Sequence, residues 1–340
     1  MRIVVDVMGG DHGAETIIDG ARLALQSSTS ITQLALVGRL ADIEAGMKHT
    51  GCRDPRVTIV PASEVLNMDD KPVEGLRQKK DCSVLRAVDL LKDGLGDAMI
   101  SSGSTGGIVA ACVRHLRRLP GVDRPGIATI IPAPKNEFVL LDSGACVECK
   151  PAHLLQFAIM GSIYSREILG YKNPRVGILS NGKEPNKGTE ITQEASGLCK
   201  MADINFIGFV EGHDLFNNEV DVVVCDGFVG NIVLKTLESF AKGMGSWIKE
   251  EIYKNPKRIL GGMLVKNALG AIKRRMDPDR FGGAPLLGLN GTIFKAHGSS
   301  GAVAIANAIG ECAKALQHRL NQMIASELAK ANAHASAAKP

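Results

Sequence analysis

Short apolar runs alternate with amphipathic segments over the first third of the chain. Strands are predicted for "RIVVDVM", "QLALVG", "RVTIVPA" and "DAMISS". Helices are predicted near Thr16–Gln26, Leu40–His49 and Arg77–Lys92, and the apolar helix "IVAACVRHL" follows the turn "GSTGG". Strands that are apolar at nearly every position are buried on both faces, so the pattern predicts a parallel sheet covered by helices on both sides.

The middle of the chain interrupts this alternation. Two short strands, "GIATIIPA" and "EFVLLDSG", are separated by "PKN" and predict an antiparallel hairpin. The alternation then resumes with a helix from Pro151 to about Leu169, the strand "RVGILS", a helix near Ile191–Met201, and the strands "INFIGFV" and "DVVVCD". A long helix from about Asn231 to Ile252, a last strand in "GTIFKAHGSSG" and a final helix from Ala302 to about Leu328 complete the pattern.

These elements predict a single α/β domain over residues 1–328, with a doubly wound, mostly parallel, Rossmann-like sheet and a small hairpin element near residues 120–150. The alanine-rich tail, residues 329–340, is expected to fray. Ligands of such sheets bind outside the carboxyl ends of the strands. The turns "MGGDHG", "SSGSTGG", "SNGKEPNKG", "CDGFVGN" and "KAHGSSG" are therefore expected at one edge.

Composition narrows the function classes. The chain has 340 residues, 45% hydrophobic, with a net charge of +4, which is ordinary for a globular protein. Aromatic residues make up only 4%, so a base-stacking surface for nucleic acid is not expected. No secretory leader and no long uncharged apolar run is visible. The eight cysteines are then expected to stay reduced in the cytoplasm.

The glycine-containing turns carry the candidate chemistry, because backbone N–H groups at the start of a helix bind anions. Each turn could equally be a simple cap or a close packing contact. The candidate anion-binding residues in the first two turns are Gly9, Gly10, Asp11, Gly103, Ser104, Thr105 and Gly106. The later turns add Glu184, Gly227 and Gly230 as binding residues. They also supply the candidate catalytic residues Lys187, Asp226, Asn231 and His297, with Lys295 beside His297.

Other site motifs are absent or weak. "GSTGG" is neither a dinucleotide fingerprint nor a P-loop, and no G-x-S-x-G elbow occurs. Cys146, Cys149 and His153 have the spacing C-x2-C-x3-H, which could hold zinc, but the sequence supplies no fourth ligand. Buried or incidental thiols are the favoured interpretation, and no metal or cofactor is expected.

The ordered set "DVMGGDHG", "DGFVGN", "PLLGLNGT" and "KAHGSS" closely resembles the acyl-carrier-protein:phosphate acyltransferase family of bacterial phospholipid synthesis. The likeness covers about residues 1–320. It implies the three-layer α/β sandwich shared with phosphate acetyltransferase and isocitrate dehydrogenase, a homodimer, and transfer of a long-chain acyl group from acyl carrier protein to inorganic phosphate. The acyl phosphate product is then passed to a membrane enzyme, which implies a cytoplasmic protein that contacts an anionic membrane surface.

Three positions depart from the family pattern. The family commonly has G-N-T-G-A where this chain has "GSTGG", so Ser104 replaces an amide. Cys146 stands where the family commonly has Asn in G-A-N, and Ser180 stands where Asn often precedes "GKE". These replacements affect details of the pocket more than the reaction class, and they make the C-x2-C spacing look incidental.

The mechanism expected from these residues needs no covalent intermediate. Phosphate is a nucleophile at neutral pH and a thioester has a good leaving group, so the protein must position both and stabilise an oxyanion. Lys187, Asn231 and backbone N–H groups of "GSTGG" and "GFVGN" are the candidate anion contacts, and His297 the candidate proton donor. Asp226 is expected to pair with Lys187 or His297, or to accept N–H groups of its own turn.

Residues 249–276 contain eight Lys or Arg and two Glu around an apolar stretch. This pattern suits an anionic membrane surface or an acidic carrier protein, although an ordinary core-facing helix pair would also fit it. The candidate membrane contacts are Ile259, Leu260, Met263, Leu264, Val265 and Leu269. Two rival functions remain at this point: a phosphate acetyltransferase-like enzyme that uses acyl-CoA, and a non-catalytic scaffold that senses lipid or binds the carrier.

Overall fold

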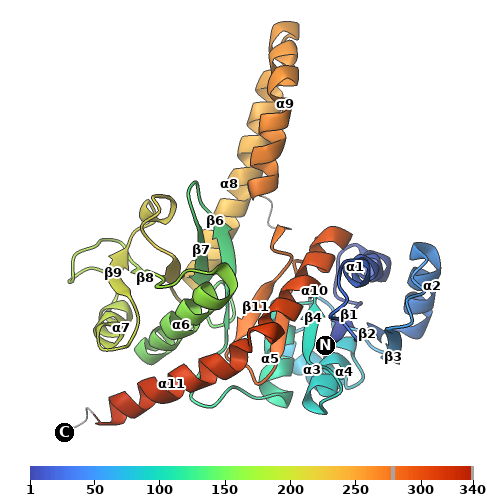
Figure 1. Ribbon diagram of the computed structural model, residues 1–340, viewed down its shortest axis with the longest axis horizontal. Helices are drawn as coiled ribbons and strands as arrows, with labels where there is room; N and C mark the ends of the chain where they lie inside the picture. The colour runs from blue at the N-terminus through green and yellow to red at the C-terminus, as the bar shows by residue number, and fades with distance from the viewer. Residues whose placement is uncertain (277–279, 338–340) are drawn as a thin grey trace.

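Residues 1–276 and 280–337 are described by a computed structural model (Figure 1). Among these residues, seven strands form the larger sheet, in the order β3-β2-β1-β4-β12-β11-β5. They are β1 (Arg2–Asp6), β2 (Gln33–Gly38), β3 (Val57–Pro61), β4 (Ala98–Ser101), β5 (Gly126–Ile127), β11 (Ala284–Leu287) and β12 (Thr292–Lys295). The pairs within β3-β2-β1-β4-β12 are parallel, whereas β11 runs antiparallel to both of its neighbours.

In the same described part of the chain, five strands form a second sheet, in the order β6-β7-β10-β8-β9. They are β6 (Thr129–Pro132), β7 (Glu137–Leu141), β8 (Val176–Leu179), β9 (Phe206–Val210) and β10 (Val222–Val224). The predicted hairpin is confirmed, since β6 and β7 pair antiparallel, and the remaining pairs are parallel. The mixed α/β class is also confirmed, but the sequence pattern did not reveal that the strands divide between two sheets.

Helices surround both sheets, as the alternation predicts. The helices are α1 (Gly13–Ser27), α2 (Leu40–Thr50), α3 (Pro72–Gln78), α4 (Ser83–Lys92), α5 (Thr105–His115), α6 (Pro151–Tyr164), α7 (Glu190–Lys200), α8 (Gly227–Tyr253), α9 (Pro256–Met276), α10 (Ala302–Gln317) and α11 (Leu320–Ala337). A π-helical turn, η1 (Ser165–Leu169), extends α6, and a 3-10 turn, η2 (Asp214–Phe216), precedes β10.

Two predicted helices are each divided in the structure. The helix expected from Arg77 to Lys92 is divided into the end of α3 and the whole of α4. Asp81 lies between them, and its carboxylate accepts hydrogen bonds from the backbone N–H and the hydroxyl of Ser63. The final helix breaks between α10 and α11, where Arg319 has a positive φ of 50°. Helix α11 then continues to Ala337, and residues 338–340 of the expected frayed tail lie outside the described residues.

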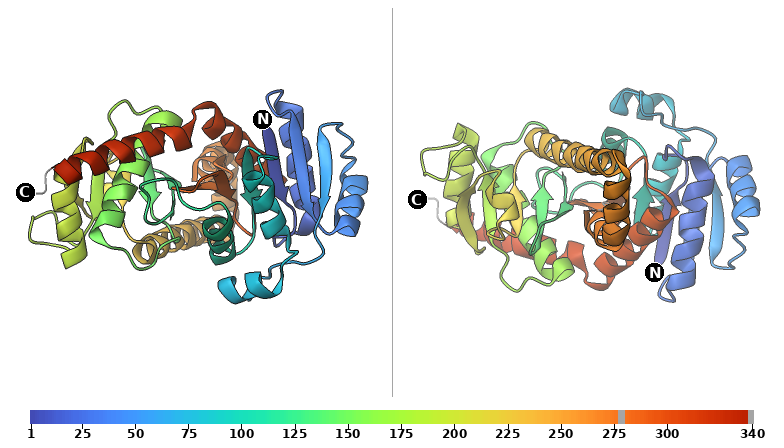
Figure 2. Two further views of the ribbon diagram at one scale, coloured as in Figure 1. Left: turned by 90° about the horizontal axis from the view of Figure 1, so that it is seen from below. Right: turned by 90° about the horizontal axis from the view of Figure 1, so that it is seen from above.

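One hydrophobic core runs through both sheets. Val5 of β1 and Val224 of β10 belong to the same buried cluster, although they lie in different sheets. Helix α11 crosses from one sheet toward the other, and its Ile324 and Leu328 are fully buried (Figure 2). The shared core holds the carboxyl edges of the two sheets in a fixed relation, which is what allows a site to form between them.

Helices α8 and α9 project together from the body of the molecule (Figure 1). No residue of α9 is buried, and at Gly262 an added Cβ would lie 2.6 Å from a methyl group of Ile252, so the two helices pack closely on one another. The core-facing alternative for residues 249–276 is therefore wrong. Within the described residues, none of the helices has the length and apolar character needed to cross a lipid bilayer.

Candidate active site

The loop after β7 is organised by one buried carboxylate. Asp142 is fully buried, and its two oxygens accept hydrogen bonds of 2.6–3.0 Å from the backbone N–H groups of Ile127, Gly144, Ala145 and Cys146. Burial raises the pKa of Asp142, and these donors oppose the shift by stabilising the charged form. The carboxylate thus fixes the loop against which the next element packs.

Helix α8 begins directly against this loop. Asp226 is its N-cap and accepts a 2.9 Å hydrogen bond from the Val229 backbone, while the Gly227 backbone donates to the Cys146 carbonyl at 2.8 Å. A Cβ at Gly227 would lie 2.7 Å from the Asp142 carboxylate, and one at Gly230 would collide with the Asp142 carbonyl. Both glycines are therefore required by packing.

These contacts decide the question of Asp226. Of the three arrangements expected, the structure has the one in which its carboxylate accepts an N–H of its own turn. In the described residues Asp226 forms no ion pair with Lys187 or His297, so those two expectations are wrong. Since the Gly227 and Val229 N–H groups already have acceptors inside the protein, the anion-binding capacity of "GFVGN" is smaller than its glycines indicate.

Helix α8 then connects the two sheets. Asn231 faces Gly144, since a Cβ at that glycine would lie 3.7 Å from the Asn231 amide oxygen. Lys235 follows one helical turn later on the same face, and its ammonium lies 3.2 Å from Nε2 of His297, at the end of β12. A single helix therefore carries polar groups from the edge of the smaller sheet to the edge of the larger one.

Lys235, Lys295 and His297 form a group of cationic and hydrogen-bonding side chains where the sheets meet. Burial, and next the charge of Lys235, lower the pKa of Lys295 to about 8, and its ammonium donates to the Ala296 carbonyl at 2.7 Å. The same two causes lower the pKa of His297. His297 Nδ1 lies 2.8 Å from the Ser299 hydroxyl, which leaves Nε2 to accept from Lys235. Lys235 also forms a 2.8 Å ion pair with Glu238, which offsets part of the positive charge of the group. With Lys295 and His297 beside it, the group still offers donors to an anion.

The turn after β1 reaches this group from the other side. The Asp11 backbone donates to the Gly298 carbonyl at 2.8 Å, and a Cβ at Gly298 would lie 3.0 Å from the Asp11 carboxylate. Gly10 lies beside the same turn, because a Cβ added at Gly10 would lie 3.8 Å from the Gly298 carbonyl oxygen. Gly9 packs so tightly on the Gly103 backbone that no side chain fits there. The structure thus brings the turns after β1, β4 and β12 together.

The turn "GSTGG" is partly covered by its neighbours. A Cβ at Gly106 would lie 2.8 Å from the Pro72 ring, and one at Gly107 would collide with Leu66. Ser104 is the N-cap of α5 but forms no capping hydrogen bond, and Ser104 and Thr105 are half-buried. Gly103 packs against Gly9 of the turn after β1, and packing against Pro72 and Leu66 explains Gly106 and Gly107.

Lys187 and Glu184 lie in the exposed loop after β8, at the same edge as the start of α8. The loop closes on itself: the Lys187 backbone donates to the Glu184 carbonyl at 2.9 Å, and the Asn181 side chain accepts from the Gly188 backbone at 2.9 Å. Lys183 is engaged elsewhere, in a 2.7 Å ion pair with buried Asp214. Both lysines of this loop are exposed, and Lys187 is the one that is not engaged with Asp214.

The predicted membrane contacts lie on α9. Leu260, Met263 and Leu264 are 63%, 65% and 82% exposed, and Val265 is exposed as well. Ile259 and Leu269 are half-buried, on the side turned toward α8. The exposed apolar face is interrupted by basic residues, with Lys273, Arg274 and Arg275 in the last turn.

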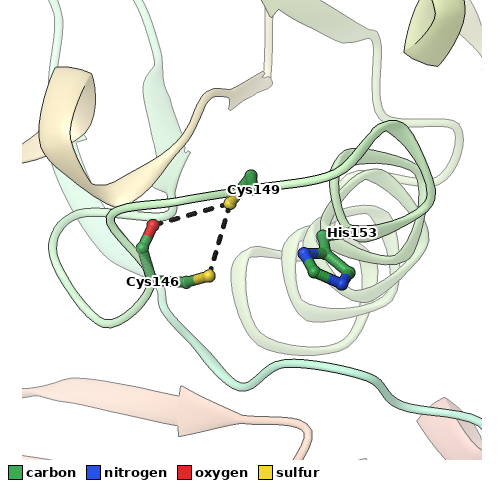
Figure 3. Close-up of side chains that lie close together, drawn as sticks. All are labelled: Cys146, Cys149 and His153. Carbon is green, nitrogen blue, oxygen red and sulfur yellow. Dashed lines mark hydrogen bonds between the residues drawn. The ribbon is translucent and has the colours of Figure 1, made fainter. Parts of the chain in front are cut away.

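The C-x2-C-x3-H residues are clustered at the edge of the Asp142 loop (Figure 3). The Cys146 and Cys149 sulfurs are 3.5 Å apart, and His153, in the first turn of α6, has its Nδ1 3.0 Å from the Lys150 backbone N–H, which donates to it. The thiol–thiol hydrogen bond lowers the pKa of Cys146 and raises that of Cys149. Burial lowers the pKa of His153.

Comparison with known proteins assigns this architecture. A family described as "Fatty acid synthesis protein" matches residues 1–323. The chain is 43% identical to the phosphate acyltransferase of Akkermansia muciniphila, over 97% of this chain and 96% of that protein. It is 44% identical to the phosphate acyltransferase of Pelotomaculum thermopropionicum, over 96% of this chain and 95% of that protein. The chain belongs to the phosphate acyltransferase family.

The protein is therefore an acyltransferase, and the family resemblance drawn from its turn motifs is confirmed. Solved structures agree on the fold. A phosphotransacetylase from Streptococcus pyogenes matches with a TM-score of 0.59 at 18% identity, over 93% of this chain and 94% of that one. A branched-chain phosphotransacylase from Enterococcus faecalis matches with a TM-score of 0.57 at 13% identity, over 96% and 99%.

Three residues of this candidate site were missed or undervalued by sequence reasoning. Asp142 follows an apolar strand and looks like an ordinary turn residue, and only its four backbone donors reveal its role. Lys235 lies inside a helix, where a lysine usually faces solvent. Lys235 follows Asn231 by four positions, and this spacing indicates that both side chains lie on the same face of the helix. Lys295 was noticed beside His297, but the sequence did not show that it is largely enclosed.

Proposed function

We propose that the protein transfers a long-chain fatty acyl group from acyl carrier protein to inorganic phosphate, giving acyl phosphate for phospholipid synthesis. The observation that carries this proposal is the convergence of Lys235, Lys295 and His297 at the carboxyl edges of both sheets. Phosphate needs cationic donors, and the reaction needs it held beside a thioester. Positioning of this kind is worth about 7–11 kcal/mol of the barrier.

The exposed apolar face of α8 supports an acyl substrate. This face is open to solvent and begins beside the cationic group. It carries Ile232, Lys235, Thr236, Ser239, Phe240, Gly243 and Trp247, all from α8 itself. From Lys235 to Trp247 the helix rises about 18 Å, which is comparable to an extended long acyl chain. The carbonyl of the thioester would then lie near Lys235 and the hydrocarbon would follow the helix toward Trp247.

In this mechanism a phosphate oxygen attacks the thioester carbonyl, and the carbon–sulfur bond breaks to release the carrier thiol. Hydrogen phosphate carries the proton that the departing thiolate needs, so no net proton is consumed. Neutral His297 accepts that proton and passes it to sulfur. Lys235 and Lys295 stabilise the phosphate and the developing oxyanion. Lys187 and Asn231 make further anion contacts, and Asp226 holds the start of α8 in place.

The donor assay tests this function. Purified protein is incubated with phosphate and either long-chain acyl carrier protein or acetyl-CoA, and free carrier thiol is measured. Phosphate-dependent release from the acyl carrier protein, at a much higher kcat/KM than from acetyl-CoA, is expected. Preference for acetyl-CoA would favour a phosphate acetyltransferase-like enzyme. Turnover of neither donor would contradict the proposed transfer to phosphate.

Replacing Asn231 or Lys187 by alanine is expected to lower kcat at least about tenfold, because each removes one donor to the anion. Both side chains are exposed, so the thermal midpoint of unfolding should stay unchanged. Steady-state kinetics and circular dichroism melting measure the two quantities. Lys183→Ala is the matched loop control, because Lys183 pairs with Asp214. Wild-type turnover in both variants would remove these residues from the site.

We also propose that the α8–α9 projection contacts an anionic membrane surface while the body stays in the cytoplasm. Leu264→Glu places a charge at the most exposed apolar position of α9 and is expected to reduce binding to anionic liposomes severalfold. Liposome flotation at low and high salt measures the effect. Leu95→Glu, at an exposed leucine outside the projection, is the control. Unchanged flotation of Leu264→Glu would reject the membrane contact.

A homodimer completes the proposal. Further exposed apolar side chains lie in the second half of α8, including Met244, Ile248 and Tyr253. An apolar surface of this extent suits a protein interface as well as a membrane. Sedimentation equilibrium of the purified protein is expected to give twice the chain mass, and a monomer at micromolar concentration would contradict it.

A further inference from the structure

Two thiols and an imidazole meet at one point beside the Asp142 loop. Cys146 and Cys149 come from the loop itself, and His153 comes from the first turn of α6. One ring nitrogen of His153 is turned toward the two sulfurs (Figure 3), and the three ligand atoms all lie within 4.8 Å of one another. We propose that these three side chains form a binding site for Zn²⁺ or a similar thiophilic divalent cation.

The distances fit a zinc site after a small adjustment. Zinc binds thiolate sulfur at about 2.3 Å and imidazole nitrogen at about 2.0–2.1 Å, so two sulfurs on a tetrahedral ion are about 3.7 Å apart. The Cys146 and Cys149 sulfurs are already 3.5 Å apart. The imidazole nitrogen has to approach by at most about 1 Å, which rotation of the His153 side chain supplies.

The donor types select the class of metal. Two thiolates with an imidazole suit Zn²⁺ and exclude the hard cations Mg²⁺ and Ca²⁺, which require oxygen ligands. All three side chains are buried, with exposed fractions of 7%, 9% and 7% for Cys146, Cys149 and His153. Burial shields the metal-bound thiolates from solvent. Because Asp142 already fixes the loop, little conformational entropy is lost when the ligands come together on the metal.

The surrounding charge also favours a cation. The carboxylates of Asp142 and Asp226 act on both thiols from nearby. A divalent cation that replaces the two thiol protons balances the charge of the two thiolates. The negative charges of the two carboxylates then attract the cation further. Arg124 is the opposing charge at Cys146.

The missing fourth ligand does not rule the site out. Zinc sites with three protein ligands, including the Cys2His set, keep a water molecule in the fourth position. Binding has local costs. His153 Nδ1 now accepts the Lys150 backbone N–H at 3.0 Å and would exchange that bond for the metal. The two thiols would also give up their hydrogen bonds to the carbonyls of Glu148 and Cys146. The gain is a crosslink between α6 and the loop whose Cys146 carbonyl accepts the Gly227 N–H of α8.

Metal titration of the full-length protein tests the site. The reduced protein is treated with a chelator, freed of it, and titrated with Co²⁺ and then Zn²⁺. We expect one equivalent of Co²⁺ to give the absorption of a tetrahedral thiolate complex, and Zn²⁺ to displace it and raise the thermal midpoint. Cys146→Ser and Cys149→Ser should lose the thiolate band. His153→Gln should keep a thiolate band but bind at least tenfold more weakly.

Cys52→Ala is the control, because Cys52 is an equally buried thiol outside the cluster and its loss should leave the Co²⁺ spectrum unchanged. Circular dichroism verifies that each variant is folded. The wild-type protein alone is decisive where a variant fails to fold. Less than a fifth of an equivalent bound, or no rise in the wild-type thermal midpoint with Zn²⁺, would overturn the proposal. A wild-type spectrum identical to that of Cys146→Ser would overturn it equally.

Discussion

Replacing Lys295 by methionine is expected to lower kcat/KM for acyl transfer to phosphate about a hundredfold while the protein stays folded. The loss follows from removing an enclosed cation at the centre of the proposed anion site, where one well-placed donor is worth about 10²–10³ in rate. Methionine keeps the length and volume of the side chain without the charge. Steady-state kinetics with varied phosphate measures the change, and activity within twofold of wild type would remove Lys295 from the mechanism.

Stability should respond in the opposite direction. The pKa of Lys295 is lowered to about 8 in the folded protein from an ordinary 10.5. A lysine with a lowered folded-state pKa costs stability below pH 8, and that cost disappears as the pH rises from 8 to 10.5. Lys295→Met removes the cost, so its thermal midpoint at pH 7 should equal or exceed that of wild type. A fall in activity combined with unchanged or higher stability distinguishes a functional lysine from a structural one.

The same pKa predicts how phosphate binding depends on pH. As the pH rises through about 8, Lys295 loses its proton and the KM for phosphate should increase in the wild-type protein. Bound phosphate stabilises the charged lysine, so the increase should begin at the pKa of the free protein and level off above the higher pKa of the complex. Lys295→Met should show a high KM that does not follow this change, and a parallel rise in both proteins would place the titrating group elsewhere.

Asp142→Ala is expected to lower the free energy of unfolding by at least about 3 kcal/mol and to abolish activity. The substitution leaves the N–H groups of Ile127, Gly144, Ala145 and Cys146 without their acceptor in a buried loop, and each unsatisfied donor costs about 1–3 kcal/mol. Chemical denaturation measures the stability. The loss of activity has a local cause, since the loop supports the start of α8.

Asp42→Ala is the control for Asp142→Ala. Asp42 forms an exposed ion pair with Arg39 at 2.6 Å, and its removal should leave stability and activity nearly unchanged. If Asp142→Ala lost no more stability than Asp42→Ala, the loop would have another source of order. In that case the account of how α8 is positioned would be wrong.

The sequence predicted most elements because their periodicity is local. The buried strands β1, β4 and β10 are apolar at nearly every position, and no other element type suits them. The divided helices were missed because the causes of the breaks are tertiary. Asp81 bonds to Ser63, eighteen residues away, and nothing in the pattern near Asp81 signals this. Strand β11 has only four residues and contains Pro285 as its second residue, so its sequence shows no alternation typical of a strand.

The site was predictable by class and not by detail. Glycine turns at strand ends indicated an anion site, and the turns after β1, β4 and β12 do meet. The glycines themselves proved ambiguous, because Gly227 and Gly230 are explained by contact with Asp142. The pairing of Lys235 with His297 joins helix α8 to the turn after β12, 62 positions apart, and no local pattern predicts such a contact.

Helix α8 is one uninterrupted rod of 27 residues, about 40 Å long. Its first turn is wedged against Asp142, its third carries Lys235 to His297, and its far end lies in the projection. A stiff rod clamped near one end transmits a push at its free end as a tilt at the clamp. Load on the projection would therefore change the spacing between Lys235 and His297, which would couple the proposed membrane contact to the proposed anion site.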